Sequence, residues 1–167
     1  MNKQALIEQI IEQLTLTHQT AVDAAQRAHE TATNEENAPE NEYDTLSLEA
    51  AYLAHGQSQR VAECIADLQA FKALDFANPM TQQQVILGSL VELADEDDKA
   101  KWVFFGPSAG GLKLQMPSEE NANAIIEVTV VTPSSPLGKE LLNRAVDDEV
   151  ELTICDKKTF FDIIALY

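Results

Sequence analysis

Five carboxylates lie close together between two helix-like stretches, with no basic side chain among them to neutralise their charge. They belong to residues 34–44 and are Glu35, Glu36, Glu40, Glu42 and Asp44. No Lys or Arg occurs anywhere in residues 28–59, whereas seven acidic residues do. Clustered carboxylates can hold a divalent cation or meet a basic cleft in another molecule. The alternative interpretation is a solvated loop whose acids stabilise helix termini.

The stretches on either side of these acids carry apolar residues at coiled-coil spacing. In the first, about residues 2–33, the spaced positions are Leu6, Ile10, Leu14, Ala21, Ala25, Ala28 and Ala32. In the second, about residues 42–75, they are Leu46, Ala50, Leu53, Gln57, Val61, Cys64, Leu68 and Phe71, with a stutter at Gln57. Two helices of similar length joined by an acidic turn predict an antiparallel hairpin, roughly 50 Å long at about 1.5 Å per residue. The acids would then lie at its tip.

Beyond about residue 79 the pattern changes to short strands. Strand-like runs fall at residues 85–93, 102–105, 125–131, 150–154 and 160–166, and Pro136 begins a short helix. The glycine-containing run 106–111 lacks the Gly-Lys-Ser/Thr ending of a phosphate-binding loop and is predicted to be a hairpin turn. The sequence therefore predicts an α+β chain with a helical hairpin in residues 1–78 and a small antiparallel β domain in residues 79–167.

The composition favours a folded protein that does not bind nucleic acid directly. The formal net charge is -17, and 45% of the residues are hydrophobic. Such a charge repels DNA and RNA, so a basic protein surface or a metal is the more natural partner. Cys64 and Cys155 lack the spacing of a disulfide framework and are predicted to be core residues of a cytoplasmic protein. The N-terminus does not resemble a signal peptide, and no apolar run is long enough for a membrane span.

The side chains that commonly carry catalysis do not form a recognisable set. No serine lies in a Gly-x-Ser-x-Gly turn, and no histidine occurs in the predicted β domain. His18, His29 and His55 lie in the helical part without an evident further ligand for zinc. We therefore predict that the chain is not an enzyme and holds no metal by itself.

Three runs in the predicted β domain resemble a known family. Residues 134–142 read Ser-Ser-Pro-Leu-Gly-Lys-Glu-Leu-Leu, residues 146–152 read Val-Asp-Asp-Glu-Val-Glu-Leu, and residues 85–91 read Val-Ile-Leu-Gly-Ser-Leu-Val. They resemble the C-terminal domain of the GreA/GreB transcript-cleavage factors. The hairpin resembles that family too, in Glu36-Asn37-Ala38 or Glu40-Asn41-Glu42-Tyr43 and in Arg60-Val61.

The resemblance implies a fold, a partner and a mechanism. It implies an FKBP-like C-terminal domain that docks at the secondary channel of bacterial RNA polymerase, through Ser135, Pro136, Leu137, Gly138 and Lys139. The hairpin would bring Glu35, Glu36 and Glu40 to the Mg²⁺ of the polymerase active site, next to the nascent RNA. There the polymerase would cut its own backtracked transcript by two-metal catalysis, in which the carboxylates help to hold the second ion.

The tip departs from the family pattern, which places an Asp three residues before a Glu in a Gly-Asp-Leu-x-Glu-Asn context. Aligning Glu36 with that Glu puts Thr33 at the Asp position, and aligning Glu40 puts Asn37 there. Two functions therefore stay open: a factor that stimulates RNA cleavage, and a regulator that occupies the same channel without stimulating it. A third hypothesis, an FKBP-like isomerase or chaperone, rests on the implied fold alone.

Overall fold

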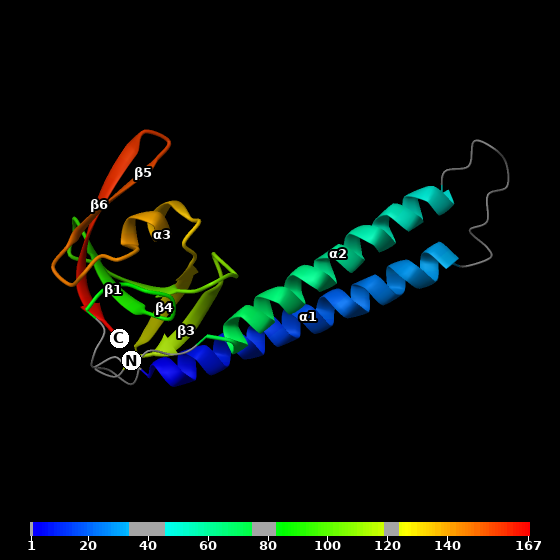
Figure 1. Cartoon of the computed structure of the whole chain (residues 1–167), viewed down its shortest axis with the longest axis horizontal. Helices are drawn as coiled ribbons and strands as arrows, with labels where there is room; N and C mark the ends of the chain where they lie inside the picture. Colours follow the sequence, from blue (N-terminus) through cyan, green and yellow to red (C-terminus); the bar gives the residue numbers. More distant parts are fainter. Residues whose placement is uncertain (1, 34–45, 75–82, 119–123) are drawn as a thin grey trace. The chain divides into compact units, whose positions relative to one another are not determined.

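The structure is a computed structural model that describes residues 2–33, 46–74, 83–118 and 124–167. In chain order (Figure 1), its elements are α1 (Lys3–Thr33), α2 (Leu46–Lys72), β1 (Leu90–Asp95), β2 (Ala100–Phe105), β3 (Lys113–Pro117), β4 (Ile125–Val131), α3 (Pro136–Leu141), β5 (Glu149–Ile154) and β6 (Lys157–Leu166). No helix within these ranges is long and apolar enough to cross a membrane.

The chain forms two compact units. One unit comprises residues 11–69, and the other comprises residues 1–10 together with residues 70–167. The first turns of α1 and the last turn of α2 thus belong to the unit that contains the sheet. The boundary predicted at residues 78–79 lies outside the described residues and stays a prediction.

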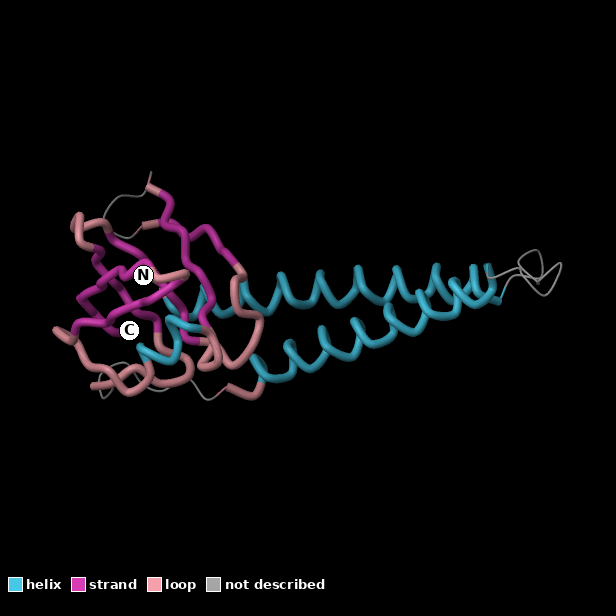
Figure 2. The backbone as a smooth tube through the Cα atoms, turned by 90° about the horizontal axis from the view of Figure 1, so that it is seen from above, coloured by secondary structure: helices cyan, strands magenta, loops and turns pink. Residues whose placement is uncertain are grey.

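The first unit, which we call the rod unit, is a helical hairpin, as the sequence predicted. Its two helices run side by side over their length in both views (Figures 1 and 2). The buried side chains follow the predicted seam and include Leu14, Ala21, Ala28, Cys64 and Leu68. These positions recur at steps of seven residues in α1 and four in α2, so each helix turns the same narrow stripe towards its neighbour.

The seam prediction is wrong at Leu53, whose side chain is 56% exposed. The second arm has consecutive steps of four residues from Leu53 to Gln57 and from Gln57 to Val61, which rotate the stripe away from a regular seam. Gly56, in the same turn, has open space where a side chain would lie. Because α1 contributes mainly alanines opposite this part of α2, a large side chain is not enclosed there.

The second unit is built around a six-stranded sheet in the order β3-β4-β2-β1-β6-β5. This confirms a small β domain after the hairpin, but the expectation of only antiparallel strands is wrong. Strands β2 and β4 pair in parallel, from Trp102 opposite Val128 to Phe105 opposite Val131. The remaining neighbours pair antiparallel.

The parallel pair also corrects the prediction for residues 106–111. Those residues do not close a hairpin, because β3 pairs with β4 and not with β2. They carry the chain past the position of β4 to the sheet edge, where the unpredicted strand β3 forms. Gly106 donates its N–H to the Val131 carbonyl oxygen at 2.9 Å, and Gly111 (φ 89°) donates to Val130 at 2.8 Å.

Apolar side chains cover both faces of this sheet. On one face, α3 contributes Leu137 and Leu141 to a core that lies against the strands. The strand residues in that core are Val91, Leu93, Val103, Phe105, Val131, Val150, Leu152, Phe161 and Ile163. Because side chains alternate along a strand, Phe104 points to the opposite face, where its ring stacks on Phe71 with centroids 6.2 Å apart.

Phe71 joins the end of α2 to the sheet. Its side chain is fully buried, and a Cβ added to Gly106 would lie 2.9 Å from its ring. Leu6 and Ile10, from the start of α1, are also fully buried. Lys3 donates to the Tyr167 carbonyl oxygen at 3.0 Å, and burial lowers the pKa of its ammonium group. These contacts explain why both helix ends belong to the sheet unit.

The two cysteines differ in environment. Cys64 is buried in the hairpin seam, as predicted, but Cys155 is exposed. The expectation that Cys155 belongs to the core is wrong because β5 has ended at Ile154. Cys155 (φ 48°) and Asp156 (φ 63°) form the two-residue turn into β6, and positive φ at both residues is typical of a type I′ hairpin.

Replacing Phe71 by Ala should lower the free energy of unfolding of the sheet unit by about 3–4 kcal/mol, because it leaves a cavity against Phe104 and Gly106. Urea denaturation followed through the single tryptophan, Trp102, measures this change. Ile125→Ala is the control, since Ile125 is 71% exposed and should lose less than about 1 kcal/mol. Equal losses in the two variants would contradict this account of the helix end.

Candidate functional site

The tip acids predicted to act at a metal, Glu35, Glu36 and Glu40, lie outside the described residues. Helix α1 ends at Thr33 and α2 begins at Leu46, so the acidic segment joins the two helix ends of the hairpin. The role of these carboxylates therefore stays a prediction. The other predicted site, at Ser135, Pro136, Leu137, Gly138 and Lys139, is fully described.

This second site begins with a capped helix start. Ser135 is the N-cap of α3, and its Oγ accepts a hydrogen bond from the Gly138 N–H at 3.0 Å. The same hydroxyl donates to the Thr132 carbonyl oxygen at 2.8 Å. Pro136 occupies the first turn, where its fixed φ suits a helix and its missing N–H would have had no partner. Ser135 thus ties the helix to the end of β4.

Gly138 allows the first turn of α3 to lie directly on the backbone before it. A Cβ at this position would overlap the Thr132 carbonyl oxygen and would lie 2.9 Å from the Ser135 Oγ. The overlap is with main-chain atoms, which cannot rotate away as the end of a side chain could. Only glycine is compatible with this close approach, which sets the position of α3.

The five residues divide into two groups by exposure. Leu137 and Gly138 are buried and Ser135 is half-buried, so they shape and anchor the segment. Pro136 and Lys139 are exposed and can contact another molecule. The structure thus brings all five residues into one turn of helix, but it leaves two of them on the surface.

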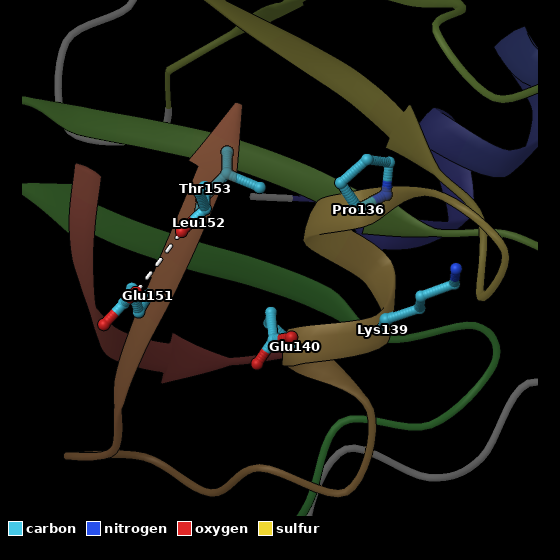
Figure 3. A pocket seen from close by; sticks show the side chains of 6 residues that line it. All are labelled: Pro136, Lys139, Glu140, Glu151, Leu152 and Thr153. Atoms are coloured by element: carbon cyan, nitrogen blue, oxygen red, sulfur yellow. Dashed lines mark hydrogen bonds between the residues drawn. The ribbon is translucent and has the colours of Figure 1, made fainter. Parts of the chain in front are cut away.

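A cavity of about 460 Å³ lies between α3 and β5 (Figure 3). Helix α3 contributes Pro136, Lys139 and Glu140, and the facing strand contributes Glu151, Leu152 and Thr153. Glu151 pairs with Lys158 at 2.6 Å, and this hydrogen bond lowers the pKa of its carboxyl group. The cavity therefore offers a carboxylate held in place on β5, together with an exposed lysine and a carboxylate on the helix.

A second cavity, of about 430 Å³, lies on the other side of the same segment. Its lining includes Ser135, Pro136 and Leu137 together with Val131 and Lys101 from the sheet. Pro136 lines both cavities. Leu152 lines both as well, so Pro136 and Leu152 lie between two concave surfaces, a shape suited to an interlocking protein contact.

The sequence did not predict that residues of β5 line the first cavity. Glu151 and Thr153 read only as polar positions of an alternating strand. They line the first cavity because β5 packs beside α3, and that neighbourhood depends on the order of strands in the sheet. A short polar pattern carries no information about which helix lies across it.

The histidines and other possible metal ligands are dispersed in the described part of the chain. Among residues 2–33, 46–74, 83–118 and 124–167, no group of three or more His, Cys, Asp or Glu side chains could hold a metal ion. His18 is half-buried in α1, whereas His29 and His55 are exposed on different helices. The described site consists of a rigid helix start, two concave surfaces and exposed charged side chains.

Sequence comparison identifies relatives among curated proteins, although no family model matches the chain. A transcription elongation factor GreA from Sphingopyxis alaskensis is 32% identical over 113 residues, which are 65% of this chain and 63% of that protein. The GreA of Novosphingobium aromaticivorans is 31% identical over 121 residues, 70% of this chain and 68% of that protein. The GreA of Zymomonas mobilis is 33% identical over 113 residues, 65% of this chain and 63% of that protein. The chain thus spans about two thirds of the length of these relatives.

Solved structures of GreA homologues are also similar, at lower identity. Gfh1 of Thermus thermophilus is 20% identical with a TM-score of 0.35, and 94% of each chain is covered. Gfh1 of Thermus aquaticus is 22% identical with a TM-score of 0.39, with 93% of this chain and 92% of that chain covered. The sequence identity with the three curated GreA proteins shows that the chain belongs to the GreA family of transcription elongation factors.

Gly138→Ala should destabilise the sheet unit by about 2–3 kcal/mol, because the new methyl group must displace the Thr132 carbonyl or the helix start. Urea denaturation measured by Trp102 fluorescence reports the loss. Gly56→Ala is a matched control: it adds the same methyl group to an exposed helical position with nothing within 4 Å. That variant should be neutral or stabilise its helix by up to about 1 kcal/mol. A Gly138→Ala protein as stable as the wild type would contradict the close approach.

Proposed function

We propose that the protein is a Gre-type elongation factor that binds bacterial RNA polymerase at its secondary channel and promotes cleavage of backtracked RNA. The observation that carries this proposal is the family relationship to proteins named transcription elongation factor GreA. The chain acts as an accessory factor in the cytoplasm, and the polymerase supplies the active site and its Mg²⁺. Its contact with the nascent RNA is indirect, and it does not bind DNA.

The α3 segment is the docking surface in this proposal. Pro136 and Lys139 are exposed on a helix start that Ser135 and Gly138 hold in place. A preorganised contact surface loses little conformational entropy on binding, which favours affinity. The cavities on both sides of Pro136 can receive side chains of the polymerase.

The acids of the hairpin act at the polymerase metal. Mg²⁺ is usually bound through one or two carboxylates together with water and substrate phosphates. Glu35, Glu36 and Glu40 provide such carboxylates, and no Lys or Arg in residues 28–59 competes for them. A second ion held in this way stabilises the attacking oxygen when water attacks a phosphodiester of the RNA and the 3′-oxygen of the retained transcript leaves.

Charge reversal at the docking surface should weaken binding. Lys139→Glu is expected to reduce affinity for RNA polymerase at least about 10-fold, since it places a carboxylate on the contact surface without disturbing the cap or the core. Pull-down or fluorescence titration with the whole protein measures this effect. This position is a cleaner test than Ser135, whose hydroxyl is needed for two internal hydrogen bonds.

Lys113→Glu is the matched control for that experiment. Lys113 is an exposed lysine of the same unit, lies on the opposite edge strand β3, and pairs only at the surface with Glu127. It should bind polymerase as the wild type does. If both charge reversals weaken binding equally, the contact depends on overall charge and not on the α3 segment.

Neutralising the tip should abolish cleavage and preserve binding. Glu36→Gln combined with Glu40→Gln keeps the shape of both side chains and removes two negative charges. We expect cleavage of RNA in stalled, backtracked polymerase complexes to fall by roughly 100-fold, as for the loss of a metal-positioning group. Polymerase affinity should stay unchanged, because docking rests on the sheet unit. Wild-type cleavage by the double variant would remove the acids from the mechanism.

A channel regulator without cleavage is the second candidate function, and the tip sequence favours it. Neither Thr33 nor Asn37 supplies the Asp of the family pattern. In the same assay, such a regulator would give no cleavage by itself and would reduce cleavage by an added active factor. Competition of this kind would keep the docking proposal and replace the catalytic one.

A further inference from the structure

The second cavity beside α3, of about 430 Å³, has an unusual charge for this protein. Of the described residues that line it, Lys101 alone is charged, and we call it the Lys101 cavity. All of its lining residues except Leu152 come from residues 99–118 and 128–139. These two segments contain four lysines and no acidic residue, in a chain with 11 basic and 28 acidic residues. The cavity is therefore a cationic place in an acidic protein.

The ammonium group of Lys101 is available to a ligand. Lys99, two residues earlier, pairs with Asp97 at 2.8 Å. The carboxylate of Asp95 accepts the backbone N–H groups of Asp97 and Lys99 at 3.0 and 2.9 Å. Two of the acids that precede Lys101 in sequence are thus engaged elsewhere. Lys101 itself forms no ion pair with any residue that the structure describes.

An aromatic ring holds Lys101 on the side of the sheet that α3 covers. Its Nζ lies 5.0 Å from the centroid of the Phe161 ring, which belongs to the core of the sheet unit. Lys101 alternates with Val103 and Phe105 along β2, so all three point to the α3 face. A cation over an aromatic face is attracted to it. The charge is therefore positioned before a partner arrives, which lowers the entropy cost of pairing.

The floor of the Lys101 cavity is apolar. Val131, Leu137 and Leu152 line it and are 7%, 8% and 9% exposed, so an aliphatic side chain that reaches them extends the core. Two hydroxyls also line the cavity wall or lie beside it, with Thr132 Oγ1 and Ser134 Oγ 3.1 Å apart. One O–H is enough for that hydrogen bond, and the other can donate to a ligand. The cavity thus fits an aliphatic side chain next to a negatively charged acceptor.

We propose that the Lys101 cavity receives an aliphatic side chain from an acidic segment of RNA polymerase, and that Lys101 pairs with an Asp or Glu next to that side chain. The inference rests on the proposed function, because Ser135 and Pro136 belong both to the docking segment and to the cavity lining. A protein segment supplies the aliphatic group and the carboxylate together. Most of a chain with a net charge of -17 repels such a segment, whereas this cavity attracts it. The pair therefore fixes the orientation in which the protein docks.

Substitution of Lys101 tests the pair by titration with whole RNA polymerase. Lys101→Met removes the charge and keeps an unbranched side chain over Phe161, and it should lower affinity about 5-fold. Lys101→Glu adds repulsion and should lower affinity at least about 10-fold. Salt screens an exposed ion pair, so the difference between wild type and Lys101→Met should shrink when NaCl rises from about 50 mM to about 500 mM.

Lys157→Met is the matched control for these variants. Lys157 is an exposed lysine of the same sheet unit, forms no ion pair with a described residue and lines neither cavity beside α3. It loses the same charge as Lys101→Met and should bind polymerase as the wild type does. Circular dichroism checks that all the variants keep the fold.

Carbodiimide coupling of the wild-type complex tests the same contact without a substitution. The reagent joins a lysine amine to a carboxylate in direct contact, forming an amide with loss of water. We expect mass spectrometry to find Lys101 joined to an Asp or Glu of the polymerase. Lys157 should stay unlinked to the polymerase in the same sample. This result does not depend on the folding of any variant.

The outcomes separate this inference from the proposed function. If Lys139→Glu weakens polymerase binding and both Lys101 substitutions leave it unchanged, the docking proposal stands and the Lys101 pair is overturned. Equal losses in Lys101→Met and Lys157→Met, or coupling of other lysines without Lys101, also overturn the pair. A wild-type chain that does not bind polymerase overturns the proposed function together with this inference. Loss of affinity confined to the Lys101 variants, with Lys101 coupled to a polymerase carboxylate, supports it.

Discussion

The sheet unit depends on a sheet that is covered by apolar side chains on both faces. The stacking of Phe71 on Phe104 fixes the end of α2 to one face, while Leu137 and Leu141 fix α3 to the other. Strand alternation makes this possible, since Phe104 and Phe105 point to opposite sides. The same sheet therefore anchors the helix end of the hairpin and supports α3, so a change in its packing affects both.

The α3 segment shows how a short helix can be held in one position. Helix α3 has only six residues, which is too few to be stable alone. Its position follows from the Ser135 cap, from the close contact of Gly138 with the Thr132 backbone, and from two buried leucines. Pro136 and Lys139 gain a fixed geometry from residues that are buried or half-buried, which explains why buried and exposed residues occur together in one motif.

Charged side chains are distributed unevenly along the chain. Carboxylates predominate in both halves of the sequence, and the acidic segment between α1 and α2 carries five of them. Residues 13–29 and 50–62 of the rod unit carry only one acidic and two basic side chains, and there the structure exposes Leu16 and Leu53 next to a hollow. A carboxylate-rich segment is instead suited to metal ions and basic walls.

The sequence alone determined the helical hairpin, the β-rich unit that follows it and the motif at residues 134–142, because these depend on local periodicity and turn chemistry. It could not determine strand order. The parallel pairing of β2 with β4 and the edge strand β3 depend on contacts between distant segments. Exposure at Leu53 and Cys155 was likewise decided by the tertiary structure. A spacing pattern shows which side of an element a residue occupies, and only the packed neighbour decides whether that side is covered.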